Sequence, residues 1–164
     1  MIEKGKISQE PFIEILKTLE EAESANLVDW NAMNIASVDQ MNQPSSRMVL
    51  LKKISDDGLV FYTNYNSRKG KEIELNPKVA VNFWWRELKK QIRVEGFIKR
   101  ASKEDSDDYF NSRPLKSRVS AIISNQSSKI SSYEDLTNQI ENYLEQNDES
   151  SIKRPDHCGL YIVI

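Results

Sequence analysis

The residues best suited to bind an anion lie between Tyr62 and Lys69, where the sequence reads Tyr-Thr-Asn-Tyr-Asn-Ser-Arg-Lys. This pattern predicts a strand end, a polar turn and a helix that starts after Ser67, with Arg68 and Lys69 in its first turn. Backbone N–H groups at a helix start, together with two cations, make a good phosphate site. Two solvated basic residues are the alternative, although cations oppose the helix dipole at this end, and that placement hints at an anion.

A second pair of cations, Arg47 and Lys52, brackets the apolar centre of a predicted strand. Residues five apart on an ideal strand face opposite sides of the sheet. Periodicity alone therefore does not direct both side chains to one ligand. From the residues themselves, two outward-facing cations on a barrel strand are the simpler interpretation.

A third group consists of Tyr109, Arg113 and Ser117, which are spaced by four residues. In a continuous helix they would share one face, and such a row could hold a phosphate even if Pro114 kinks the helix. An ordinary surface face of a helix is an equal alternative. The polar segment that follows, Ser124 to Ser128, is compatible with a simple loop.

Several kinds of chemistry lack the residues they need. His157 is the only histidine, so neither a histidine metal cluster nor a histidine-based triad can be assembled around a second one. The single cysteine, Cys158, suits a reducing compartment and is expected to be a small buried residue rather than a nucleophile. No glycine-rich dinucleotide motif or Walker motif is present. We therefore assign no catalytic residue and no metal ligand from the sequence.

The length and charge of the chain favour a single domain over residues 1–164. A net charge of −2 gives no indication of nucleic acid or an anionic membrane as the main partner. The N-terminus lacks the apolar stretch of a signal peptide, and the apolar runs are far shorter than the roughly 20 residues of a membrane span. We expect a cytoplasmic protein.

The hydrophobic pattern predicts an antiparallel barrel. Ser8 is the expected cap of a first helix in an N-terminal helical segment, 1–28. The predicted strands are 32–38, 47–54, 59–63, 79–85, 91–99 and 159–164. Further helices are expected after Ser67, Ser102, Pro114 and Ser131, and a loop over 146–158. Short strands joined mostly by hairpins, with helices at the margins, indicate a mainly β fold with flanking helices.

Taken together, these stretches resemble the pyridoxamine 5′-phosphate oxidase family. The resemblance covers most of the chain, from near Asp29 to Ile164, and its motifs follow the family order. They are Ala32-Met33, Arg47 to Lys52, Phe61 to Asn64, Ser67 to Lys69, Asn76-Pro77, Tyr109 to Pro114 and Gln126 to Ser131. No single motif is decisive, but the ordered set is specific. The resemblance implies an antiparallel split β-barrel of the FMN-binding type and a homodimer with FMN at its interface.

The resemblance also implies roles for individual residues. FMN would be bound from one subunit by Arg47, Met48, Val49, Leu50, Leu51, Lys52, Tyr62, Thr63, Arg68, Lys69 and Gln91. Gln126 and Ser127 would reach the same FMN from the other subunit. The substrate phosphate would be held by Lys52, Tyr109, Arg113 and Ser117. Arg47 and Lys52 can both serve if their strand bends.

The implied reaction is the oxidation of pyridoxamine or pyridoxine 5′-phosphate to pyridoxal 5′-phosphate. Hydride passes from the C4′ carbon of the substrate to the flavin, and dioxygen reoxidises the flavin with release of hydrogen peroxide. The protein then contributes positioning and electrostatics. One alternative is a non-catalytic or impaired split-barrel protein that binds flavin or a pyridoxal-type phosphate, and another is a structural dimer. The substrate-phosphate row favours the oxidase.

The sequence departs from the family pattern near its last predicted strand. Cys158 and Leu160 replace a usual tryptophan and a usual glycine. Family members continue with a Trp-Gln-Gly segment and an Arg-x-His element that cover flavin and substrate, and this sequence contains neither. We therefore expect the last strand to have an open outer edge. We also expect a flavin exposed to solvent, weaker FMN binding than in a longer relative, and low turnover.

Overall fold

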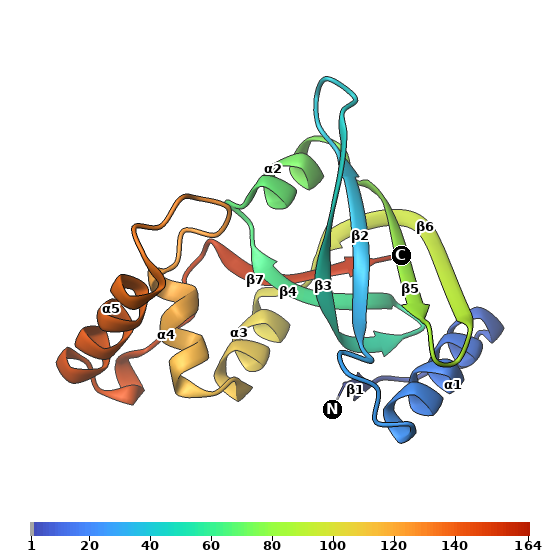
Figure 1. The fold of residues 1–164 in the computed structure, drawn as a ribbon, viewed down its shortest axis with the longest axis horizontal. Helices are drawn as coiled ribbons and strands as arrows, with labels where there is room; N and C mark the ends of the chain where they lie inside the picture. The colour runs from blue at the N-terminus through green and yellow to red at the C-terminus, as the bar shows by residue number, and fades with distance from the viewer. Residues whose placement is uncertain (1) are drawn as a thin grey trace. The chain divides into compact units, whose positions relative to one another are not determined.

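The computed structural model, which describes residues 2–164, combines a set of mostly antiparallel strands with helices that flank them (Figure 1). In chain order the elements are β1 Glu3–Lys4, α1 Glu10–Ser24, β2 Ala32–Val38, β3 Pro44–Ser55, β4 Gly58–Asn64, α2 Arg68–Leu75, β5 Lys78–Trp85, β6 Lys90–Arg100, α3 Lys103–Ser112, α4 Leu115–Ile123, α5 Tyr133–Gln146, the 3₁₀ turn η1 Glu149–Ser151 and β7 Cys158–Val163. The chain forms two compact units. The first contains the residues up to Tyr62 with 72–100 and 161–164, and the second contains 63–71 and 101–160.

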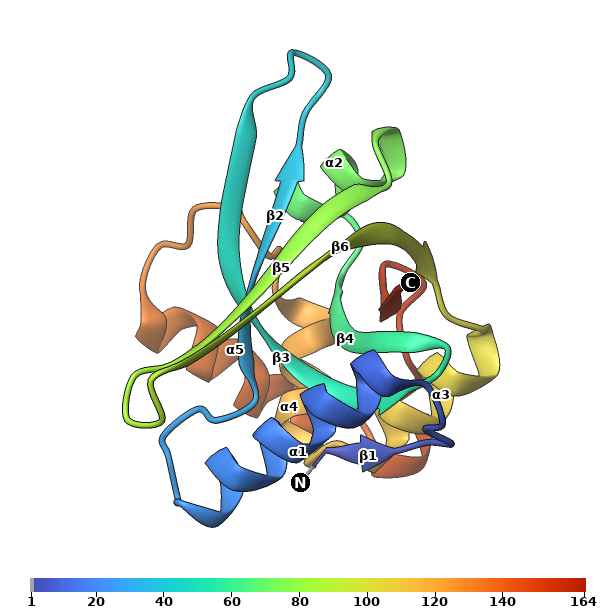
Figure 2. The ribbon, with the colours of Figure 1, turned by 90° about the vertical axis from the view of Figure 1, so that its right-hand side faces the viewer.

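Six strands close into an antiparallel barrel, which confirms the predicted fold class. Their order is β3-β2-β5-β6-β7-β4, and β4 pairs back onto β3 (Figure 2). The two-residue strand β1, which the sequence analysis missed, adds to β3 in parallel. Because every strand of the ring has two neighbours, the barrel proper has no open edge.

Inward side chains, which alternate with outward ones along the strands, fill the barrel. Inward residues of β5 are buried, and among them the rings of Phe83 and Trp85 stack with centroids 5.3 Å apart. Phe61 from β4 and Tyr161 from β7 form a second buried ring pair at 5.9 Å. Each such side chain contributes on the order of 1.5–3 kcal/mol by leaving water. This core holds the strands that carry most of the expected ligand residues.

The last strand is paired on both sides, so the expectation of an open outer edge is wrong. β7 lies between β6 and β4, with Val163 opposite Ile98 and Tyr161 opposite Arg100. On its other side the contact is close, because a Cβ on Gly58 would lie 2.0 Å from the carbonyl oxygen of Val163. Gly58 has φ +131°, a conformation that favours glycine.

The helix starts agree only in part with the predicted caps. Ser102 accepts a hydrogen bond from Asp105 N at 2.9 Å, as expected for α3. Helix α5 begins one residue later than predicted, because Ser132 rather than Ser131 is its cap. Ser8 does not cap α1. Its N–H and hydroxyl donate instead to the carboxylate of Asp56 in the β3–β4 turn, at 2.9 and 2.6 Å.

The second unit is built around α3, α4 and α5, which lie side by side (Figure 1). The segment predicted as the loop 146–158 contains the end of α5 and the turn η1. Glu149 of that turn forms an ion pair with the buried Arg118, and Arg154 pairs with Asp107 at 2.7 Å. These ion pairs hold the segment against α3 and α4. Within residues 2–164, no helix has the length and apolar character needed to cross a bilayer.

Candidate functional site

Strand β3 bends at one of the expected ligand residues. Its first half pairs with β2 and its second half with β4, and the register slips between Leu51 and Lys53, which places Lys52 at a bulge. A bulge bends the strand and changes the direction of its side chains. β3 therefore has an irregularity at Lys52, and the joint contact of Arg47 and Lys52 with one ligand stays a prediction.

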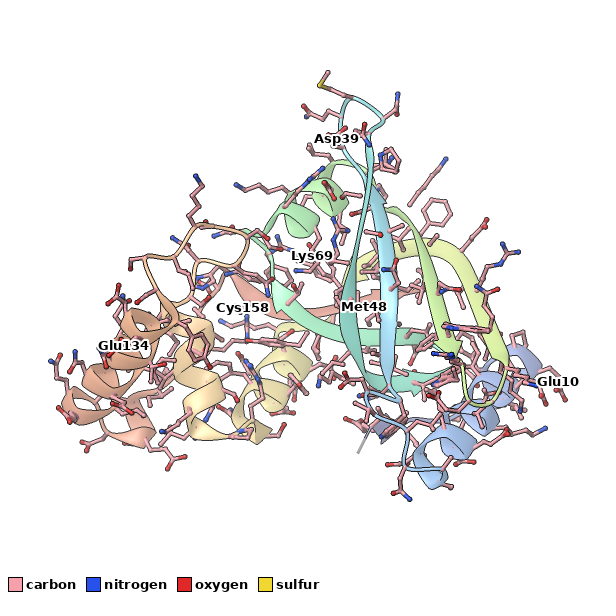
Figure 3. The ribbon with its side chains drawn as sticks, in the orientation of Figure 1. Glu10, Asp39, Met48, Lys69, Glu134 and Cys158 are labelled. Carbon is pink, nitrogen blue, oxygen red and sulfur yellow. The ribbon has the colours of Figure 1, made fainter. Side chains whose placement is uncertain are left out.

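The apolar residues of this strand divide between the two barrel faces. Val49 and Leu51 are buried in the core, whereas Met48 and Leu50 face outward with 60% and 41% of their surface exposed. Figure 3 shows Met48 on β3. Of this expected flavin-binding set, Val49 and Leu51 can offer only their backbone, and Met48 and Leu50 can offer side chains.

Arg47 is bonded to a buried carboxylate that the sequence analysis missed. Its guanidinium donates to Glu72 Oε2 at 3.0 Å and to Ser37 Oγ at 2.6 Å. The hydroxyls of Ser37 and Ser45 donate to the same carboxylate oxygen at 2.6 and 2.7 Å. Glu72 is only 4% exposed. This polar cluster, Arg47, Glu72, Ser37 and Ser45, ties β2, β3 and the middle of α2 together.

At the start of α2, two expected flavin ligands from one stretch of the chain meet a third from a distant segment. Lys69 Nζ donates to Gln126 Oε1 at 2.7 Å, and Thr63 Oγ1 donates to the same oxygen at 3.1 Å. Lys69, labelled in Figure 3, is only 7% exposed. Gln126 contacts these residues within one chain, and its expected contact with the flavin of a second subunit stays a prediction.

The helix start itself has the predicted form. Ser67 is fully buried, donates to Asn64 O at 2.6 Å and accepts from Gly70 N at 3.3 Å. Gly70 permits this turn, because a Cβ there would lie 2.0 Å from Tyr65 O. The first turn of α2 therefore presents backbone N–H groups beside Lys69, with Arg68 exposed to solvent.

The remaining expected flavin ligands lie on strands and on a turn. Tyr62 on β4 is half-buried. Gln91 lies on the outer face of β6 and donates to Asn82 Oδ1 at 2.8 Å. Ser127 has a left-handed backbone, with φ +71°, in the turn after α4.

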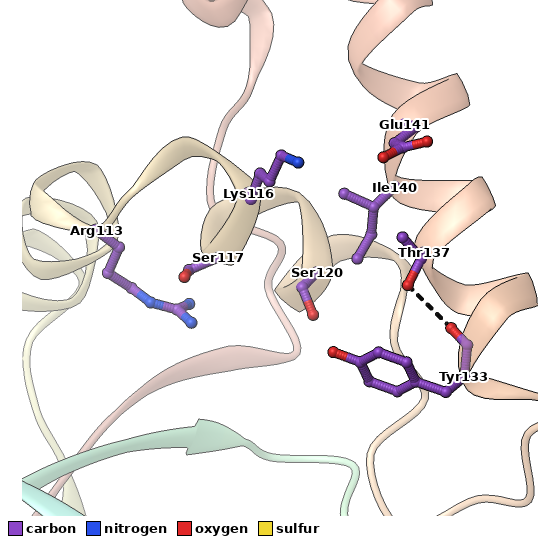
Figure 4. A pocket seen from close by; sticks show the side chains of 8 residues that line it. All are labelled: Arg113, Lys116, Ser117, Ser120, Tyr133, Thr137, Ile140 and Glu141. Atoms are coloured by element: carbon purple, nitrogen blue, oxygen red, sulfur yellow. Dashed lines mark hydrogen bonds between the residues drawn. The ribbon is translucent and has the colours of Figure 1, made fainter.

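The row Tyr109, Arg113 and Ser117 does not lie on one continuous helix. α3 ends at Ser112, Arg113 is extended with ψ 149°, and α4 begins after Pro114. Proline has no N–H to donate and disfavours helical geometry in the residue before it, which explains the break. The break takes Arg113 out of the helix, and Arg113 and Ser117 then line the same cavity (Figure 4).

That cavity, of about 450 Å³, lies between α4 and α5. It is lined by two cations, four hydroxyl side chains, one aliphatic side chain and one carboxylate: Arg113, Lys116, Ser117, Ser120, Tyr133, Thr137, Ile140 and Glu141. Its volume falls within the range of small-molecule sites. Figure 4 shows Lys116 from α4 and Glu141 from α5 extending toward one another. We call this space the α4–α5 cavity.

Most residues of the α4–α5 cavity were missed by the sequence analysis. The available signal was spacing by four, which Tyr133, Thr137 and Glu141 share on α5, as do Lys116 and Ser120 on α4. That signal cannot say which helix faces which. Tyr109 does not line the cavity. Burial raises the pKa of its phenol, and the charge of Arg113 lowers it, so Tyr109 lies within the field of that guanidinium.

The chain's only histidine and cysteine have structural contacts in the second unit. His157 Nε2 lies 3.2 Å from Ala121 O, and Cys158 Sγ donates to the same oxygen at 3.6 Å. Cys158 is 2% exposed, as predicted. Over residues 2–164 there is no group of three or more His, Cys, Asp or Glu side chains placed to hold a metal ion.

Comparison with known proteins identifies related sequences and folds. The family described as Pyridoxamine 5′-phosphate oxidase matches residues 19–146. A protein of Nostoc sp. strain PCC 7120 named Pyridoxine/pyridoxamine 5′-phosphate oxidase is 45% identical over 154 residues, which cover 94% of this chain and 72% of that protein. A protein of Hydrogenovibrio crunogenus named Pyridoxine/pyridoxamine 5′-phosphate oxidase 2 is 40% identical over 163 residues, covering 99% and 76%.

Two solved structures share the fold. PhzG from Burkholderia lata, in complex with tetrahydrophenazine-1-carboxylic acid, superposes with a TM-score of 0.87 at 24% identity, covering 95% of this chain and 76% of that one. A pyridoxamine 5′-phosphate oxidase-related, FMN-binding protein from Nostoc punctiforme gives a TM-score of 0.75 at 18% identity, covering 96% and 82%. These similarities confirm the split-barrel architecture.

Proposed function

The chain belongs to the pyridoxamine 5′-phosphate oxidase family, and on this premise we propose that it oxidises a phosphorylated B6 vitamer with bound FMN. The substrate is pyridoxamine or pyridoxine 5′-phosphate, the product is pyridoxal 5′-phosphate and the electron acceptor is dioxygen, which becomes hydrogen peroxide. With the amine, water supplies the aldehyde oxygen and the amino group leaves as ammonia. The observation that carries the proposal is the contact of Lys69 and Thr63 with Gln126. Thr63 and Lys69 belong to one stretch of the chain and Gln126 to a distant one, and each is a flavin ligand that the family resemblance implies.

The start of α2 fits the phosphate of FMN. Lys69 is nearly buried, and a buried ammonium is stable only with polar partners. The neutral oxygens of Gln126 and Ser67 are among its acceptors. A phosphate placed there would receive charge-assisted hydrogen bonds from Lys69 and Arg68 and from backbone N–H groups of the helix start.

The outer face of the barrel supports a homodimer with FMN at the interface. Met48, Leu50, Trp84 and Phe97 expose between 41% and 60% of their surface there, on strands β3, β5 and β6, with β2 between β3 and β5. Exposed apolar groups on one sheet face are typical of an interaction surface. Gln91, an expected flavin ligand, lies on that face too. Sedimentation of the flavin-bound protein as a monomer at micromolar concentration would contradict the dimer.

The α4–α5 cavity is the proposed place of the substrate phosphate. Arg113 and Ser117 supply a guanidinium and a hydroxyl for its oxygens, and Lys116 adds positive charge. Lys52 and Tyr109 complete the set that the resemblance implies. Bound FMN would supply the acceptor for the hydride from C4′ and the route of its electrons to dioxygen. The chain's own task is to fix the substrate by its phosphate so that C4′ is correctly oriented.

An oxidase assay tests the proposal. The protein, loaded with FMN, is incubated with pyridoxamine 5′-phosphate in air, and pyridoxal 5′-phosphate and hydrogen peroxide are measured together. We expect both products in equal amounts, and neither when FMN is omitted. Stoichiometric FMN binding without either product would contradict the oxidase and leave a flavin-binding protein.

A further inference from the structure

Lys52, which the family resemblance implies as a ligand of FMN and of the substrate phosphate, is the extra residue of the bulge in β3. Leu51 lies opposite Phe61 of β4, and Lys53 lies opposite the next residue, Val60. One residue of β3 therefore has no matching position on β4. Such a residue leaves the regular ladder, and the direction of its side chain follows the local bend of the strand. The position of the Lys52 ammonium group therefore depends on what holds Leu51 and Lys53.

Asn31, the residue before β2, holds the backbone on the N-terminal side of the bulge. Its carbonyl oxygen accepts from Leu51 N at 2.9 Å, and its side-chain amide donates to Leu51 O, also at 2.9 Å. Both backbone groups of Leu51 are thus bonded to one residue, although the β2–β3 ladder ends one position earlier, at Ala32 and Leu50. Leu51 is also fully buried, so it cannot shift without disturbing the core.

Strand β1 holds the backbone on the other side of the bulge. It pairs with β3 in parallel, with Glu3 opposite Lys53, and the Glu3 carboxylate forms an ion pair with the Lys53 ammonium at 2.6 Å. Gly5 N donates to Ile54 O at 2.9 Å. Gly5 lies so close to β3 that a Cβ there would come within 2.7 Å of Ser55 Cβ. β1 therefore fixes the residues that directly follow the bulge.

We propose that Asn31 and β1 are positioning elements for Lys52, which hold the bulge in β3 so that its ammonium group stays in place for the phosphate of the vitamer. This inference rests on the proposed function, because it assigns a supporting role around one residue of that site. Lysine carries its charge on a flexible four-carbon stem, so fixing its backbone narrows the positions that the ammonium group can take. Asn31 and β1 belong to none of the expected ligand sets, so their effect on binding passes through Lys52.

The test is a double-mutant cycle on binding, measured by calorimetric titration of the FMN-saturated protein. One probe is 4-deoxypyridoxine 5′-phosphate, whose C4′ carries no amine or hydroxyl to be oxidised, and the other is 4-deoxypyridoxine, which also lacks the phosphate. Asn31→Ala removes the side-chain bond to Leu51, and Gly5→Leu forces β1 away from β3. Each should weaken binding of the phosphate probe by about threefold, as for the loss of one neutral hydrogen bond, and leave the other probe unchanged. Lys52→Met alone should weaken the phosphate probe by about tenfold or more, because it removes a charged donor.

The cycle separates positioning from general stability. In a Lys52→Met background, Asn31→Ala and Gly5→Leu should cause no further loss of affinity for the phosphate probe, although they still lower the urea midpoint. Asn31→Ala alone suffices for the cycle if Gly5→Leu does not fold. Asn34→Ala is the matched control, because Asn34 lies on β2 and donates to the Met48 sulfur at 3.7 Å instead of to the backbone beside the bulge. It should leave the affinity for both probes unchanged.

Additive losses in the Lys52→Met background would overturn the inference. Equal weakening of both probes, or an unchanged affinity in a folded Asn31→Ala protein, would overturn it as well. The inference also fails if Lys52→Met binds the phosphate probe as tightly as the unaltered protein, but the oxidase does not, because product formation in air tests that proposal independently. An unaltered protein that neither binds the phosphate probe nor forms pyridoxal 5′-phosphate would overturn both proposals.

Discussion

The polar cluster around Arg47 and the α4–α5 cavity both bring cations near a carboxylate, and they differ in what satisfies the charges. Arg47 donates to Glu72 at 3.0 Å, and Glu72 is 4% exposed and bonded by two serine hydroxyls as well. Lys116 and Glu141 are both exposed and line a cavity instead. The first set of charges is satisfied by the fold itself. The second set is available to a ligand, so loss of a carboxylate should affect stability in one case and recognition in the other.

The largest effect is expected for Glu72→Ala. Removing one partner of a buried ion pair leaves the other charge uncompensated, and we expect the free energy of unfolding to fall by about 3 kcal/mol. Urea unfolding at neutral pH measures this change. The double variant Arg47→Met with Glu72→Leu should recover most of the loss, because neither charge remains. A loss below about 1 kcal/mol for Glu72→Ala is in the range of an exposed ion pair. It would contradict the view that the fold depends on the Arg47–Glu72 pair.

Lys69→Met should weaken FMN binding more than it lowers the stability of the fold. Hydrogen bonds to charged groups contribute about 1.5–3 kcal/mol, so FMN binding should weaken by that amount. Riboflavin, which lacks the phosphate, should bind almost as before. Flavin fluorescence titration measures both affinities, with Lys71→Met, exposed on the same helix, as the control. Equal weakening of FMN binding and riboflavin binding would show that Lys69 acts on folding or on the flavin ring instead of the phosphate.

Lys116→Gln tests the exposed charges of the α4–α5 cavity, the second of the two regions compared. The exposed ammonium adds a modest attraction for phosphate, of about 0.2–1 kcal/mol. We expect both vitamers to bind more weakly by the same factor, with no change in the urea midpoint. Lys103→Gln on α3, which does not line the cavity, provides the control. A lowered midpoint would mean that Lys116 supports the fold, as Arg47 does.

The smallest effect is expected for Asp56, a carboxylate bonded at the surface. Hydrogen bonds from the Ser8 side chain, then from the Ser8 and Gln9 backbone, lower its pKa below the usual 3.8. A lowered pKa in the folded state means that the stabilisation is present above the unfolded value and is lost as the pH falls through the folded value. Asp56→Asn should therefore lower Tm slightly at neutral pH and leave it unchanged well below pH 3.8. A difference that persists in acid would contradict this account.

The barrel was predictable because its information is local. In β2 the buried Met33 and Ile35 alternate with outward residues, and the strand has the predicted bounds, 32–38. The Asp57-Gly58 turn and the cap at Ser102 are equally short-range signals. Period-two alternation and turn residues specify strands and hairpins without reference to the rest of the chain.

What the sequence could not supply depends on which distant segments meet. Arg47 and Glu72 are separated by 25 positions, and Lys69 and Gln126 by 57. Spacing by four marks a face of α4 and a face of α5, but packing decides that Lys116 and Glu141 share a cavity. The break at Arg113 and Pro114 was predictable, because proline disfavours helical geometry in the residue before it.

The position of β7 in the ring has a consequence for how the molecule folds. β4 ends at Asn64 and β7 begins at Cys158, yet these strands are neighbours in the barrel. On the ribosome, the hairpins β2–β3 and β5–β6 can form early, but the ring stays incomplete until β7 has been synthesised and inserted between β6 and β4. Contacts between segments so far apart in sequence slow folding, because the long loop must close before they form. Until then β4 and β6 each expose an unpaired edge, which makes the nascent chain prone to association with other strands.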